Sequence, residues 1–236
     1  STIAEIQGAK IIRQKLNSDF TLNEDIFTKK ADCAFIANPN PQAGTLFTIG
    51  QMERLARSIG GILAIDEAYV DFGAESMADQ VEAFDNLLVV HTLSKSRSLA
   101  GLRVGYAMGH PDLIEGLRRI KDSFNSYTLD RLALAGAQAA IEDRDYYDAM
   151  AAKIMATRER SKERLINLGF DVIPSAANFI FIRHPARRGV ELFQALRNRG
   201  ILVRHWTKER ISEYLRVTIG TDEDMETFIR ICREII

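Results

Sequence analysis

The chain has 236 residues, a formal net charge of −1 and a hydrophobic fraction of 46%. These values are typical of a globular protein of one large or two modest domains, and they argue against nucleic acid or a membrane as the main partner. The two cysteines, Cys33 and Cys232, lie far apart and no apolar run could span a bilayer, so we expect a reducing, cytoplasmic setting. The four histidines lack the spacing of metal ligands, and no metal site is expected.

The first part of the sequence alternates apolar strands with helices. A helix is expected from residue 3 to Gly8, and Thr48 and Gln51 form a capping box at the start of a second helix that Gly60 ends. The expected strands are residues 9–12, 33–37, 62–65, 87–91 and 103–108. Continuous apolar strands between helices predict an α/β fold with a mostly parallel sheet covered on both faces.

The second part of the sequence has a different pattern. Helices are expected at residues 129–141, 146–168, 190–198 and at the carboxyl end, with strands at 171–173, 178–182, 201–204 and 214–219. This mixture predicts a small α+β domain. We place the large domain at residues 1–145 and the small C-terminal domain at residues 146–236.

The most informative segment is the loop around Lys95, which follows the strand at 87–91. Desolvation beside a second cation lowers the pKa of a lysine and makes its amine a nucleophile that forms an imine. Ser94 and Arg103 are suited to bind a phosphate group. Together these residues suggest pyridoxal phosphate as cofactor; the alternative is a solvated surface lysine.

Three further side chains are expected at the carboxyl ends of the strands, where ligands gather in such sheets. Asp66 is suited to pair with a pyridinium nitrogen, or else it caps the following segment. Tyr69 and Asn40 are suited to hydrogen-bond the oxygen on a cofactor ring; alone, Tyr69 would be a core tyrosine and Asn40 part of a turn. Their common position predicts one shared site that includes Lys95.

Two arginines fall in or beside the C-terminal strands. Arg216 lies within the apolar run 214–219, and Arg204 stands at the end of the run 201–204. A guanidinium at such a position either holds an anionic substrate by a bidentate contact or belongs to a structural ion pair. We regard Arg216 as the stronger substrate-binding candidate.

The ordered motifs resemble those of fold-type I pyridoxal-phosphate-dependent aminotransferases, and most of all the histidinol-phosphate aminotransferases of class II. The resemblance covers essentially the whole chain. The matching segments are Asn38-Pro39-Asn40-Pro41-Gln42-Ala43-Gly44, Asp66-Glu67-Ala68-Tyr69, Ser94-Lys95, Ala100-Gly101-Leu102-Arg103-Val104-Gly105 and Tyr214-Leu215-Arg216-Val217-Thr218-Ile219-Gly220.

The resemblance implies a role for each of these residues. Lys95 would hold the cofactor covalently and move a proton, Asp66 would bind the pyridinium nitrogen, and Ser94 and Arg103 would bind the cofactor phosphate. Tyr69 and the Asn40 region would contact the ring hydroxyl, and Arg216 would bind the anionic group of the substrate. The implied enzyme transfers an amino group between histidinol phosphate and 2-oxoglutarate in histidine biosynthesis, as a cytoplasmic homodimer.

The sequence also departs from the family pattern. Pro41 and Gln42 replace the second Asn-Pro step of the usual Asn-Pro-Asn-Asn-Pro-Thr-Gly turn, and Arg97 is an extra cation that either lowers the pKa of Lys95 or faces solvent. Family members also have an N-terminal arm, a Gly/Ser-rich phosphate loop and a stacking aromatic residue before the point that matches Ser1. The chain is therefore interpreted as a truncated form. The alternatives to a histidinol-phosphate aminotransferase are a related pyridoxal-phosphate enzyme, such as a threonine-phosphate decarboxylase or an aromatic aminotransferase, and a truncated, catalytically inactive dimerising remnant.

Overall fold

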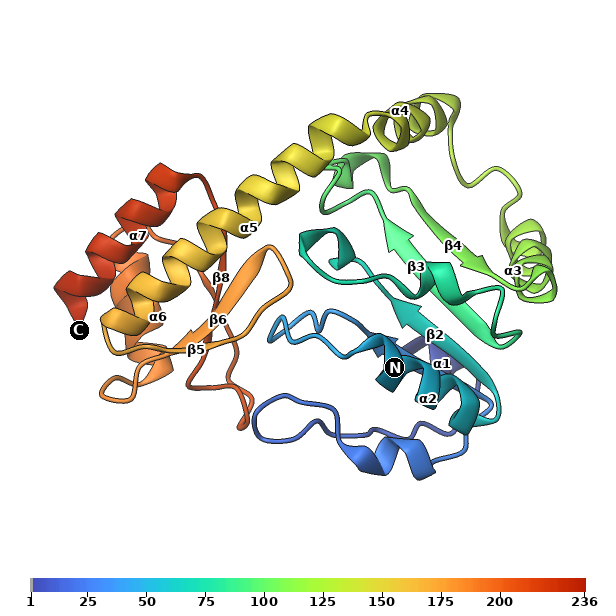
Figure 1. Ribbon diagram of the computed structural model, residues 1–236, viewed down its shortest axis with the longest axis horizontal. Coiled ribbons are helices and arrows are strands. Elements are labelled where there is room, and N and C mark those ends of the chain that lie inside the picture. Colours follow the sequence, from blue (N-terminus) through green and yellow to red (C-terminus); the bar gives the residue numbers. More distant parts are fainter. Residues whose placement is uncertain (1) are drawn as a thin grey trace.

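The computed structural model describes residues 2–236, which form two four-stranded sheets with helices beside them (Figure 1). The first sheet contains β1 (Cys33–Ala37), β2 (Ile62–Asp66), β3 (Leu87–Thr92) and β4 (Gly105–Gly109), in that order. β1, β2 and β3 are parallel, whereas β4 is antiparallel to β3. The expected α/β fold with a mostly parallel sheet is confirmed, with β4 as the exception.

The core of the first sheet lies between its strands and α2 (Ile49–Ile59). Thr48 and Gln51 form both hydrogen bonds of the predicted capping box, and Gly60 ends the helix with φ 85°. The buried side chains are Met52, Leu55, Ala56 and Ile59 from the helix and Leu63, Ile65, Leu87 and Val89 from the strands. Their helical spacing on one side and their apolar strand runs on the other explain why these segments pack together.

Short helices and loops connect the remaining parts of the first half. The N-terminal helix α1 (Thr2–Ile6) is followed by residues 9–12, which were expected to form a strand and are irregular instead. The 3₁₀ helices are η1 (Glu24–Thr28), η2 (Val70–Phe72), η3 (Met77–Gln80) and η4 (Ala100–Leu102). The helix α3 (Pro111–Phe124) was not predicted; Pro111 occupies its first turn and His110 caps it, but none of its residues is buried.

The second sheet is antiparallel, with the order β5-β6-β8-β7. Its strands are β5 (Asp171–Ile173), β6 (Phe179–Arg183), β7 (Arg204–His205) and β8 (Leu215–Thr218). The remaining helices of the chain are α4 (Arg131–Glu142), α5 (Arg144–Asn167), α6 (Gly189–Asn198) and α7 (Asp222–Ile235). α4 packs near the first sheet, in a cluster with Leu93 and Val104. α5, α6 and α7 cover one face of this sheet around a core that includes Leu165, Ile180, Leu215 and Phe228.

The other face of the second sheet packs against loops of the first. Phe179 contacts Tyr69 and Phe72, which follow β2, and Phe181 belongs to a cluster with Phe20 and Ala43. α5 runs from the side of the first sheet to the side of the second (Figure 1). This contact brings β6 and β8 to the edge of the first sheet where its parallel strands end.

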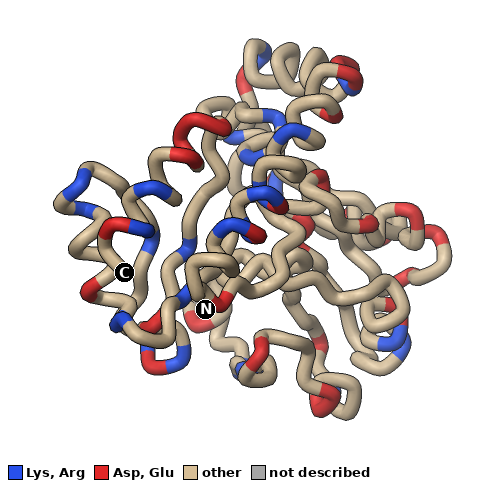
Figure 2. Tube along the Cα trace, turned by 60° about the vertical axis from the view of Figure 1, so that its left-hand side comes forward, with Lys and Arg blue, Asp and Glu red and all other residues tan. Residues whose placement is uncertain are grey.

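The boundary between residues 145 and 146 stays a prediction, although it falls within the first turn of α5. The expected strand 201–204 is reduced to Arg204–His205, so Arg204 begins β7 rather than ending a strand. Lys, Arg, Asp and Glu are distributed along the trace (Figure 2). No helix within residues 2–236 is long and apolar enough to cross a membrane.

Candidate active site

The proposed site residues lie at one edge of the first sheet. Ala37, Asp66 and Val90 are register partners, and the Asn38 N–H donates to the Asp66 carbonyl at 2.9 Å. Because β4 is antiparallel, its first residue, Gly105, pairs with Thr92 at the end of β3. The ends of three strands and the start of the fourth therefore meet at one edge of the sheet, and that these segments form one shared site stays a prediction.

The Lys95 loop is fixed by its own backbone. Ser98 N–H donates to the Lys95 carbonyl at 3.0 Å, and Leu99 N–H donates to the Leu93 carbonyl at 2.9 Å. Leu93 is buried in an apolar cluster with Val104, which directly precedes β4. The loop is thus held at both ends, while Lys95 itself is exposed and its Nζ lies 5.4 Å from the centroid of the Tyr69 ring.

Asp66 and Tyr69 differ in burial. Asp66 is exposed, and its Oδ1 accepts the Ala68 N–H at 3.0 Å, as expected of a residue that caps the following turn. Tyr69 is 9% exposed, and its ring meets Phe179 edge to face with centroids 5.3 Å apart. No ion pair of Asp66 or Lys95 occurs among residues 2–236, so both charges are available to a ligand.

The three remaining candidates for cofactor contact hydrogen-bond within their own loops. Asn40 Oδ1 accepts the N–H groups of Gln42 and Ala43, both at 2.9 Å, which leaves its amide nitrogen as the group able to donate. Ser94 Oγ accepts from the Thr92 hydroxyl at 3.0 Å. Arg103 has a left-handed φ of 57° and donates to the Ala100 carbonyl at 3.0 Å.

Arg216 reaches the same edge from the second sheet. Its guanidinium donates to the Pro41 carbonyl at 2.6 Å and lies 4.8 Å from the Phe179 ring centroid. Phe179 in turn contacts Tyr69, whose ring lies beneath Lys95 Nζ. A continuous row of cation–π and aromatic contacts therefore links the lysine to the arginine.

Two further arginines have aromatic partners. Arg204 stands beside Arg216 in the β7–β8 register, and both guanidinium carbons lie 5.5 Å from the Trp206 ring centroid. Arg97 lies over the Tyr147 ring at 4.9 Å. Arg204 and Arg216 thus share one aromatic partner, whereas Arg97 lies over a side chain of α5.

The sequence interpretation missed a buried polar group beside the site. Glu67 is 1% exposed, and its carboxylate accepts a bond from His91 Nε2 at 2.8 Å. Burial, with a smaller contribution from Asp71, raises the pKa of Tyr106, whose hydroxyl lies 3.1 Å from His91 Nδ1. A Glu directly after an apolar strand, with a His within the next strand, was the available signal.

This fold, with a lysine, a carboxylate and a tyrosine at the ends of parallel strands, is that of the pyridoxal-phosphate-dependent aminotransferases. The chain belongs to the aminotransferase class I and II family, whose family model matches residues 1–231. The predicted family membership is confirmed.

Relatives and solved structures agree with this assignment. The chain is 50% identical over 226 residues to a histidinol-phosphate aminotransferase from Aromatoleum aromaticum, covering 94% of this chain and 64% of that protein. It is 52% identical over 217 residues to one from Gluconacetobacter diazotrophicus, covering 91% of this chain and 61% of the relative. It therefore spans less than two thirds of the length of these relatives. The structure of the Sinorhizobium meliloti enzyme in complex with pyridoxal 5′-phosphate has a TM-score of 0.76 at 24% identity, covering 87% of this chain and 57% of that chain.

Proposed function

We propose that the chain belongs to an aminotransferase that moves an amino group between histidinol phosphate and 2-oxoglutarate, in histidine biosynthesis, with pyridoxal phosphate held by Lys95. The observation that supports this most strongly is the row of contacts from Lys95 through Tyr69 and Phe179 to Arg216. Through these contacts an amine and a guanidinium lie near the same edge of the first sheet, as the proposed roles of Lys95 and Arg216 require. The 50% identity to a histidinol-phosphate aminotransferase supports the substrate.

The groups at this edge fit the cofactor chemically. The Lys95 amine is exposed, and a lysine amine can form an imine with the aldehyde of the cofactor. The Asp66 carboxylate accepts a single backbone bond and suits a protonated ring nitrogen. Ser94 and Arg103 offer a hydroxyl and a cation for the phosphate, and the Asn40 amide nitrogen is available for the ring oxygen.

Pyridoxal phosphate, when bound, withdraws electrons from an amine joined to it and so makes the neighbouring C–H group acidic. Asp66 would keep the ring nitrogen protonated, which sustains that withdrawal. Lys95 Nζ would first hold the cofactor and, once freed by the substrate amine, would move a proton between the substrate carbon and the cofactor carbon C4′. The Tyr69 ring, packed against Phe179, would keep the lysine over the edge of the sheet.

Arg216 would bind the anionic group of each substrate. Its guanidinium is held by the Pro41 carbonyl and two aromatic faces rather than by a carboxylate, so its charge is not neutralised among the described residues. The phosphate of histidinol phosphate and a carboxylate of 2-oxoglutarate suit the same cation in alternate half-reactions. Arg204, beside it, would add charge for the dianionic phosphate.

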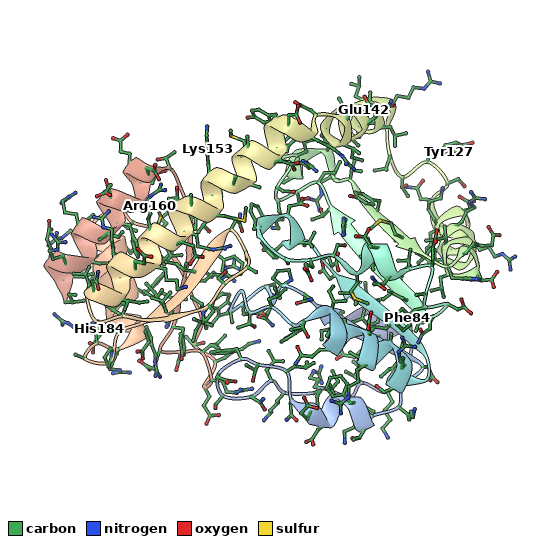
Figure 3. The ribbon with its side chains drawn as sticks, in the orientation of Figure 1. Phe84, Tyr127, Glu142, Lys153, Arg160 and His184 are labelled. Atoms are coloured by element: carbon green, nitrogen blue, oxygen red, sulfur yellow. The ribbon has the colours of Figure 1, made fainter. Side chains whose placement is uncertain are left out.

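We also propose a cytoplasmic homodimer. Both cysteines are free thiols, as is usual in a reducing compartment. Large apolar side chains gather between α3 and α4, where Phe124 is 85% and Tyr127 92% exposed; Tyr127 points away from the sheets in Figure 3. Such a patch favours burial against a second copy.

The test is a comparison of two amines that differ only in the phosphate. The chain is loaded with pyridoxal phosphate, and histidinol phosphate or histidinol is added while the visible absorbance of the bound cofactor is recorded. We expect histidinol phosphate to discharge the absorbance at concentrations about tenfold or more below histidinol, and Arg216→Met to remove that preference. Equal responses to the two amines would refute the proposed substrate, and an unchanged preference in Arg216→Met would refute the role of Arg216.

A further inference from the structure

Glu67 is a buried carboxylate that none of the proposed roles uses. Its side chain has no exposed surface. Oε1 accepts the Met77 N–H at 2.7 Å, and Oε2 accepts from Ser76 Oγ at 2.5 Å and from His91 Nε2 at 2.8 Å. Burying a carboxylate is costly unless it is hydrogen-bonded, so loss of one of these three donors would destabilise this part of the fold.

His91 extends this network across three strands. It lies on β3, paired in register with Tyr106 on β4, and the Tyr106 hydroxyl lies 3.1 Å from His91 Nδ1. Because Nε2 faces a carboxylate it carries the hydrogen, and because burial raises the pKa of Tyr106 the phenol keeps its proton and donates to Nδ1. The chain of donors therefore runs from Tyr106 through His91 to Glu67. Glu67, His91 and Tyr106 line a small pocket, and the charged side chains Asp71 and Arg97 line the same pocket. Arg144 is a third charged group near Tyr106.

The two ends of the Glu67–His91 bond are close in sequence to Asp66 and Lys95, the two groups proposed to hold the cofactor. Glu67 directly follows Asp66 and begins the turn that carries Tyr69, while His91 precedes Lys95 by four residues. The backbone adds a second tie, since the Glu67 N–H donates to the Val90 carbonyl at 2.9 Å. The side-chain bond thus joins the segment of the carboxylate to the segment of the lysine.

We propose that Glu67 and His91 are positioning residues that fix the Asp66–Tyr69 turn relative to the Lys95 loop. This inference rests on the proposed function, because the fixed distance matters only if Asp66 and Lys95 hold one ligand between them. Loss of the His91 donor would leave a buried carboxylate short of a partner and free both segments to move. Ser76 donates to the same oxygen but does not reach β3, so loss of its hydroxyl would not free the Lys95 loop to move.

The experiment measures how fast Lys95 captures pyridoxal phosphate in four proteins: the wild type, His91→Leu, His91→Gln and Ser76→Ala. The rate is followed by visible absorbance, and stability is measured by urea unfolding without cofactor. We expect His91→Leu to slow capture about tenfold or more, and His91→Gln, whose amide can donate to Glu67, to stay within about threefold of wild type. Ser76→Ala should lose stability and still capture at close to the wild-type rate. An unchanged rate in His91→Leu, or equal slowing in Ser76→Ala, would overturn the proposal.

A second readout needs no cofactor and separates this proposal from the proposed function. Hydrogen exchange of the apo chain is compared at residues 67–72 and 93–99, with β6 and β8 as internal references. His91→Leu should speed exchange about tenfold in both segments and leave the reference strands unchanged. If the wild type captures no cofactor, the proposed function fails for this chain, and hydrogen exchange alone then decides whether Glu67 and His91 hold the two segments together. Unchanged exchange in His91→Leu overturns the positioning role. If His91→Leu does not fold, His91→Asn replaces it with the same expected outcomes, because its amide is too short to reach Glu67.

Discussion

Replacing Arg158 should weaken the contact between the two sheets. Arg158 lies on α5 with its side chain 9% exposed, and its guanidinium donates to the Phe72 carbonyl at 2.9 Å and to the Ala177 carbonyl at 2.8 Å. Phe72 follows β2 and Ala177 precedes β6. The same two segments carry Tyr69 and Phe179, so Arg158 supports the aromatic contact between the lysine and Arg216.

The magnitude follows from the two bonds. A hydrogen bond from a charged donor contributes about 1.5–3 kcal/mol, and a buried carbonyl left without a partner is costly. Arg158→Met keeps much of the apolar stem, and relief from burying a cation offsets part of the loss. We therefore expect the free energy of unfolding to fall by about 3 kcal/mol, which lowers the urea midpoint by about 1 M or more at a typical slope.

Arg160→Met is the matched control on the same helix. Arg160, labelled in Figure 3, has a side chain 56% exposed and pairs with Asp222 at 2.5 Å. An exposed ion pair contributes little to stability, so this variant should stay close to wild type. Urea unfolding followed by fluorescence and circular dichroism measures both variants. If Arg158→Met falls within about 0.5 kcal/mol of Arg160→Met, the reasoning about the buried guanidinium is refuted.

Two further predictions concern the reactivity of the two cysteines and the dependence of stability on pH. Burial raises the pKa of Cys232 to about 12, whereas Cys33 is exposed. A thiol reagent at about pH 8 should therefore modify one cysteine in the folded chain and two after unfolding. Rapid modification of both cysteines in the folded chain would contradict the burial of Cys232. The hydrogen bond from Arg164 holds the pKa of Glu226 below its ordinary value of 4.5, so this pair stabilises the fold at neutral pH and the contribution is lost as the pH falls below that value. Thermal unfolding between about pH 3 and pH 6 should therefore show a smaller decrease in Tm on acidification for Glu226→Gln than for the wild type, most clearly at low salt; parallel curves would refute this.

Much of the fold could be predicted because its signals are local. Continuous apolar runs define β1, β2 and β3, and the capping box at Thr48 defines the start of α2. The direction of β4 could not be predicted, because a parallel or an antiparallel partner buries the same apolar residues. α3 was not predicted, although Pro111 marks its first turn. None of its residues is buried, so it adds nothing to the apolar core on which the prediction of the fold depended. Residues 9–12 read as a strand on apolar content alone, yet they pair with no strand among the described residues.

The candidate site was predictable in its residues and less so in its connections. Strand ends and polar side chains located Asp66, Lys95 and Arg216, but their mutual placement depends on Phe179, an ordinary core residue in the sequence. Glu67 resembles a surface residue until its burial is known. Buried polar contacts join segments that are distant in sequence, and no local pattern encodes their partners.

The central claim is that Lys95 is the lysine that holds pyridoxal phosphate. The direct measurement is to add the cofactor, reduce with borohydride and locate the added phosphopyridoxyl group by mass spectrometry of peptides. Lys153→Arg is the matched control, since Lys153 is an exposed lysine on α5 that is labelled in Figure 3. We predict one group per chain, on Lys95, that persists in Lys153→Arg and is lost in Lys95→Arg. A label spread evenly over the surface lysines, or none on Lys95, would contradict the account.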